Sequence, residues 1–62
     1  MIKFEQVDGI EQFDAAAYTQ GGHFIKAGHR EECEQAAIDC GGLYCWVIRG
    51  QLVIRGDFQR DE

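Results

Sequence analysis

The histidines and cysteines of this 62-residue chain are the side chains whose types could bind a metal ion. His29, Cys33, Cys40 and Cys45 are all zinc-ligand types, and His29 and Cys33 are spaced as two ligands on one helix face. However, the pattern H-x3-C-x6-C-x4-C lacks the C-x2-C pair that makes zinc-binding sequences recognisable. Cysteine is also among the most often buried residue types, so core packing is the simpler explanation. We therefore expect no metal and no other cofactor.

A cysteine beside a histidine base is also the arrangement of a thiol nucleophile. His23 and His29 are expected in a loop and at a helix start, and Cys45 is expected on a core face, where a thiol is inert. The glycines form neither G-x-G-x-x-G nor G-x4-G-K-[ST], and glutamates at a helix start are favourable there without any catalysis. We predict no catalytic residue and expect a protein that is not an enzyme.

The charge and the cysteine count restrict the partners and the compartment. Eleven acidic residues against six basic ones give a net charge of −5, which repels nucleic-acid phosphates and anionic membranes. The longest apolar run, residues 43–48, is far shorter than the roughly 20 residues that cross a bilayer. The first residues carry acids where a signal peptide would be apolar, and an odd number of cysteines indicates free thiols. We expect a soluble cytoplasmic protein without a membrane partner.

Residues 41–58 hold the densest run of large apolar and β-branched side chains, and the rest of the fold is expected to form around them. The segments 43–48 and 52–54 are typical strands, and the short glycine-bearing link between them is typical of a β-hairpin. Two turns are open: a type I′ turn centred on Arg49-Gly50 and a type II′ turn centred on Gly50-Gln51. The choice does not change which side chains share a face.

The hairpin has two faces of different character. One is apolar and suits a core, and it carries Leu43, Cys45, Val47, Leu52, Ile54 and Phe58. On the other, the Arg55 guanidinium is placed to lie over an aromatic ring, an interaction worth about 0.5 to 1 kcal/mol when exposed. Exposed aromatic residues flanked by charge are typical of an interface, although a helix or the N-terminal segment is an alternative cover for this face. This second face carries Tyr44, Trp46, Ile48, Val53, Arg55 and Asp57.

Two elements are predicted before residue 21. Ile2 and Phe4 alternate with polar residues and predict a short edge strand over residues 1–7. A helix is predicted over residues 10–20, with Asp8 and Glu11 as a capping box and Gly21-Gly22 as its end. Its apolar stripe is Ile10, Phe13 and Ala17. The alternative is one longer helix from Phe4 through Phe13, in which Gly9 would cost about 1 kcal/mol.

A strand over residues 23–27 and a second helix from residue 29 or 30 to residue 40 complete the prediction. Small apolar residues recur in this helix at i, i+3, i+4 and i+7, and Gly41-Gly42 follows as a stop signal. The stripe is Cys33, Ala36, Ala37 and Cys40. The resulting order, β-α-β-α-β-β, or α-β-α-β-β without the first strand, predicts one α+β domain over residues 1–62. It is a two-layer sandwich of two helices on a mixed or antiparallel sheet of three to four strands.

The second hairpin face leads us to expect a non-enzymatic protein-binding module, with a protein partner or a second copy bound there. The alternative is single-stranded nucleic acid stacked on the same aromatic residues, which the net charge disfavours. In size and charge the chain is similar, by analogy of class alone, to the small acidic proteins with which phages and other mobile elements inhibit host enzymes. The predicted partner-binding residues are Tyr44, Trp46, Ile48, Val53 and Arg55.

Overall fold

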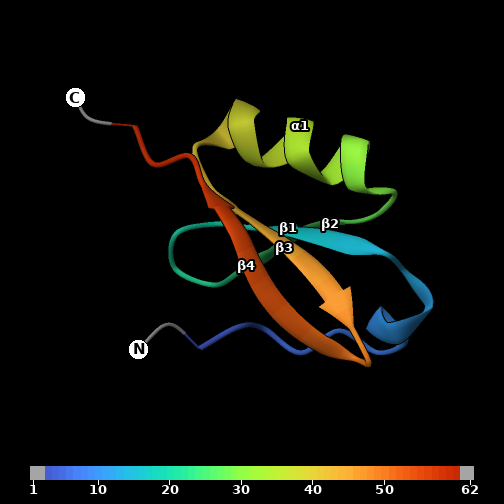
Figure 1. Ribbon diagram of the computed structural model, residues 1–62. Coiled ribbons are helices and arrows are strands. Elements are labelled where there is room, and N and C mark those ends of the chain that lie inside the picture. Colours follow the sequence, from blue (N-terminus) through green and yellow to red (C-terminus); the bar gives the residue numbers. More distant parts are fainter. Residues whose placement is uncertain (1–2, 61–62) are drawn as a thin grey trace.

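The computed structural model describes residues 3–60 and has an α+β fold with one antiparallel four-stranded sheet. Helix α1 covers one face of the sheet, and the N-terminal segment crosses the other (Figure 1). The strands stand in the order β2-β1-β3-β4, so β2 and β4 are the edges. The elements are the 3-10 helix η1 (Ile10–Gln12), β1 (Ala15–Tyr18), β2 (Phe24–Gly28), α1 (Arg30–Cys40), β3 (Leu43–Ile48) and β4 (Gln51–Asp57).

Strand β1 replaces most of the helix predicted over residues 10–20, so that prediction is wrong. All four of its residues are fully buried, and it pairs antiparallel with β2 on one side and β3 on the other. The preference of alanine for helix is small and is readily overridden by tertiary context, here two strand partners and cover on both faces. Gly21-Gly22 consequently lies in the link between β1 and β2, where Gly22 N–H donates to the Thr19 carbonyl, and does not end a helix.

The N-terminal segment is neither a strand nor a capped α-helix within the described residues. Residues 3–7 have no strand assignment, and Met1 and Ile2 of the predicted edge strand lie outside the described residues. Gly9, with a φ of 78°, precedes η1, and no side chain caps that turn, so the Asp8–Glu11 capping box is wrong. The segment is held instead by packing of the Phe4 ring edge-on against Tyr18, with the ring centroids 4.9 Å apart.

Helix α1 is confirmed, together with its glycine stop. Cys33 and Ala37 are fully buried as predicted, but Cys40 at the end of the stripe is exposed. Gly41 has a φ of 67°, and the N–H groups of Gly41 and Gly42 donate to the carbonyls of Ile38 and Ala37. This Schellman motif ends the helix at Cys40, and only Gly41 and Gly42 separate it from β3. No helix among residues 3–60 is long and apolar enough to span a bilayer.

The hairpin of β3 and β4 is confirmed, with the type I′ alternative as its turn. Arg49 and Gly50 both have positive φ, 53° and 76°, as that turn requires. Cys45 pairs with Ile54 and Tyr44 with Gly56, so Arg55 is the extra residue of a β-bulge. The bulge exchanges the faces beyond it, so Phe58 packs on the α1 side and its predicted place beside Leu52 and Ile54 is wrong.

The sheet carries a small hydrophobic core on each face, so both faces of the β3–β4 hairpin are partly buried. On the α1 side the buried cluster is Ala15, Ala17, Cys33, Ala37 and Tyr44, with Ala36, Trp46 and Phe58 packed against it. Under the N-terminal segment it is Ala16, Tyr18, Leu43 and Cys45, with Phe4, Ile10, Phe24, Ala27 and Leu52 packed against it. Of the residues predicted for the core face, Leu43, Cys45 and Leu52 belong to this second cluster, whereas Ile54 has 46% of its surface exposed.

The two glycines after α1 should differ sharply in their tolerance of a side chain. Gly41→Ala places alanine at a left-handed position and should cost about 1 kcal/mol of unfolding free energy. Gly42→Ala should cost about 3 kcal/mol or more, because its Cβ would overlap the backbone carbonyl oxygen of Tyr18 in β1. Urea unfolding measures both changes, and equal costs would contradict the close contact between residue 42 and β1.

Candidate protein-binding surface

The five residues predicted to bind a partner differ in exposure, from buried Tyr44 through half-buried Trp46 to three exposed side chains. Tyr44 is only 7% exposed because α1 covers it, and Trp46 is half-buried at the edge of the same cluster. Ile48 is 45% exposed and Val53 38% exposed, and Arg55 is exposed as well. Helix α1 packs on β1, β2 and β3, so it covers the middle of this face and leaves the end near the hairpin turn open (Figure 1).

Trp46 is held by three polar contacts. Its indole N–H donates to the Tyr44 hydroxyl at 2.9 Å, which gives the buried tyrosine a supporting role beneath the surface. The Arg55 guanidinium carbon lies 4.4 Å from the centroid of the Trp46 ring, so the predicted arginine–aromatic contact is confirmed. The Arg30 guanidinium carbon lies over the same ring at 4.0 Å. An indole placed between such contacts has little freedom to reorient.

Arg30 was missed because nothing near it in the sequence indicates which strand residue it meets. It is the first residue of α1, and Trp46 pairs with Ala15 of β1, so the contact depends on how the helix lies across β1. A cation at a helix N-terminus opposes the helix dipole, which typically costs about 0.3 to 1 kcal/mol. This positive charge at an unfavourable position is the one signal in the sequence that distinguishes Arg30.

Phe13 is a second residue that the sequence analysis assigned elsewhere, to the stripe of a helix. Its backbone is extended, with φ −109° and ψ 158°, and it lies two residues before Ala15, so strand alternation puts it on the side of the sheet that Ala15 occupies. The Val47 N–H donates to the Asp14 carbonyl and continues the β1–β3 ladder, which sets Phe13 across from Ile48. Phe13 is 40% exposed. We call the surface made by Phe13, Arg30, Trp46, Ile48, Val53 and Arg55 the Trp46 face.

The cysteines do not supply a nucleophile to this surface. Cys33 and Cys45 are fully buried, and burial raises the pKa of Cys45 to about 11 and the pKa of Cys33 above its usual value. Cys40 is exposed at the far end of α1. Among residues 3–60, no three His, Cys, Asp or Glu side chains come together to hold a metal ion.

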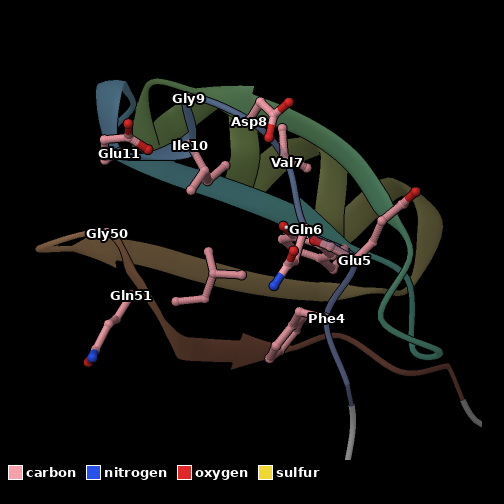
Figure 2. Close-up of a pocket in the computed structure, with 12 residues that line it drawn as sticks. Phe4, Glu5, Gln6, Val7, Asp8, Gly9, Ile10, Glu11, Gly50 and Gln51 are labelled. Atoms are coloured by element: carbon pink, nitrogen blue, oxygen red, sulfur yellow. Dashed lines mark hydrogen bonds between the residues drawn. The ribbon is translucent and has the colours of Figure 1, made fainter.

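A groove of about 590 Å3 lies on the opposite side of the sheet, between the N-terminal segment and the start of β4 (Figure 2). Three carboxylates line it, from Glu5, Asp8 and Glu11, and no basic residue does. The Tyr18 hydroxyl donates to the Glu5 carbonyl at 3.1 Å, and burial, followed by the nearby Cys45 and Glu5, raises the pKa of Tyr18. Most of the lining belongs to the N-terminal segment and η1, so the groove is the gap beneath that segment.

The reactivity of the three cysteine thiols should follow how deeply each is buried. At pH 8 the aromatic disulfide DTNB should modify Cys40 rapidly in the folded protein, while Cys33 and Cys45 react at least about 100-fold more slowly, after local or global opening. In denaturant all three thiols should react at one rate. The Cys40→Ser variant is the control and should lose the rapid phase entirely. A rapid phase that survives in this variant would contradict the inert assignment of the buried thiols.

The chain matches no protein-family model, no curated protein and no solved structure among those compared with it. Any role for the Trp46 face is therefore argued from the chemistry of its own residues.

Proposed function

We propose that this protein is a non-enzymatic protein-binding module whose partner docks on the Trp46 face. The observation that supports it is the cluster of exposed apolar side chains at the turn end of the sheet, Phe13, Ile48 and Val53, next to Trp46. Interface centres are enriched in aromatic residues and arginine and depleted in acids, and this face has that composition in a chain of net charge −5.

The fixed position of Trp46 favours binding energetically. A side chain that is already held by a hydrogen bond and two guanidinium groups loses little rotamer freedom when a partner covers it. Ordering a free side chain at an interface typically costs about 0.5 to 1.5 kcal/mol. Trp46 is therefore a pre-organised anchor, with Ile48 and Val53 as its apolar surroundings.

Single-stranded nucleic acid is the weaker alternative for this face. Base stacking needs free aromatic rings, whereas Tyr44 is buried under α1 and the Trp46 ring already carries Arg30 and Arg55. The net charge of −5 also repels a chain of phosphates. A two-fold symmetric dimer through the Trp46 face is disfavoured as well, because it would bring the arginine pairs of both copies together. A different protein is therefore the better-supported partner. A module of this size would inhibit or regulate that protein by occupying its surface.

A matched pair of variants on β4 tests the proposal. Val53 pairs with Trp46 and lies on the Trp46 face, whereas Ile54 pairs with Cys45, lies on the opposite face and is similarly exposed. In capture experiments with immobilised protein, Val53→Asp should lose at least about 90% of a bound partner, because the aspartate removes apolar contact area and places a carboxylate beside the arginines at Trp46. Ile54→Asp should retain it.

Circular dichroism and urea unfolding establish that both aspartate variants fold. The proposal fails if Val53→Asp captures the same proteins as the wild type in the same amounts. It also fails if the two variants lose the same partner equally, since the contact would then not distinguish the two faces of β4.

A further inference from the structure

Arg30 and Arg55 bring two positive charges together over one indole ring. Their guanidinium carbons lie 4.0 and 4.4 Å from the Trp46 centroid. They are therefore within about 8 Å of each other, a separation at which like charges repel appreciably near a protein surface. Both side chains are exposed.

Both arginines occupy positions that the fold alone does not favour. Arg30 is the first residue of α1, where a positive charge opposes the helix dipole, and the residue before it, His29, makes no side-chain capping bond. Arg55 is the extra residue of the β-bulge in edge strand β4. Bulges often re-aim a side chain next to a functional site. Two unfavourably placed cations at one ring indicate a requirement beyond stability.

We propose that Arg30 and Arg55 bind carboxylate groups in an acidic segment of the protein partner, with an adjacent apolar residue of that segment packed on Ile48 and Val53. This inference rests on the proposed function and specifies the chemistry of the partner. A guanidinium pairs with a carboxylate through two parallel hydrogen bonds, with the two carbon atoms about 4 Å apart. The two guanidinium carbons are at most about 8 Å apart, so a carboxylate bound by one arginine also experiences the positive charge of the other.

The surroundings favour a peptide carboxylate over a polyphosphate. A single carboxylate at the two arginines experiences the local positive field, because charges further away than about 8 to 10 Å are screened at physiological salt. An oligonucleotide would extend its phosphates over the acidic remainder of the chain, which contains eleven acids. Ile48 and Val53 also offer an apolar surface that suits a leucine-like side chain and not a phosphate.

The probe is an acetylated and amidated octapeptide of alternating Glu and Leu, compared with the same peptide in which Gln replaces Glu. Trp46 is the only tryptophan of the chain, so its fluorescence reports binding directly at the two arginines. We expect the Glu peptide to bind at least about 10-fold more tightly than the Gln peptide, and to weaken as salt is raised. Arg30→Gln and Arg55→Gln should each weaken the Glu peptide about 10-fold or more.

Arg60→Gln is the matched control. It makes the same charge change at the far end of α1, where the Arg60 guanidinium donates to the Asp39 carbonyl at 2.8 Å, and it should leave binding unchanged. Equal weakening by all three variants would overturn the proposal, because net charge alone would then explain the effect. Tighter binding of an eight-residue oligothymidylate would replace it with nucleic-acid recognition, and equally tight binding of inorganic phosphate would replace it with a free-anion site.

The two proposals fail in distinguishable ways. If Glu and Gln peptides bind equally and Val53→Asp abolishes both, the apolar face binds peptides without a carboxylate, so this inference is wrong while the proposed function stands. If the Glu peptide does not bind at millimolar concentration, the inference is also wrong, and the comparison of Val53→Asp with Ile54→Asp still decides whether the Trp46 face binds a protein.

Discussion

The complete burial of strand β1 between α1 and the N-terminal segment is the constraint on which the fold depends. Its four residues have no exposed surface, and it is paired along both edges. Ala15 and Ala17 allow α1 to lie close to the sheet, while Ala16 and Tyr18 form the floor beneath Phe4. A chain this short buries a smaller fraction of its surface than a large domain does. It uses both sheet faces, and Tyr18 supplies the one large side chain of the strand.

The same constraint determines where the surface remains open. Because α1 packs over β1, it covers Tyr44 and the inner part of Trp46 but begins only at Arg30, beside the Ala15–Trp46 pair. Ile48, two residues further toward the hairpin turn on β3, and Val53, the residue of β4 that pairs with Trp46, are left exposed. The β-bulge then brings Arg55 to Trp46 from the edge strand β4, whereas Arg30 comes from helix α1. The Trp46 face is thus the part of the hairpin that the helix is too short to cover.

Features set by neighbouring residues in the chain could be predicted from the sequence, and features set by distant pairing could not. The hairpin follows from Arg49-Gly50, and α1 follows from its small-residue stripe and its glycine stop, all of them local signals. Three of the four residues of strand β1 are alanines, which prefer helix, and its two strand neighbours together with cover on both faces make it extended. The contact of Arg30 with Trp46 depends on that strand, and the place of Phe58 depends on the bulge. Within the candidate surface, Arg55 over the ring was therefore predictable, whereas Arg30 and Phe13 were not.

Trp46 lies in a locally positive environment in an acidic protein, and collisional quenching of its fluorescence by ions tests this environment most directly. Iodide and caesium ions probe the sign of the potential around the one tryptophan, with acrylamide as a neutral reference at constant ionic strength. The two guanidinium groups predict that iodide quenches Trp46 more efficiently than caesium does, relative to acrylamide. Stronger quenching by caesium, as the net charge of −5 alone would give, would contradict the arrangement of Arg30 and Arg55 around Trp46.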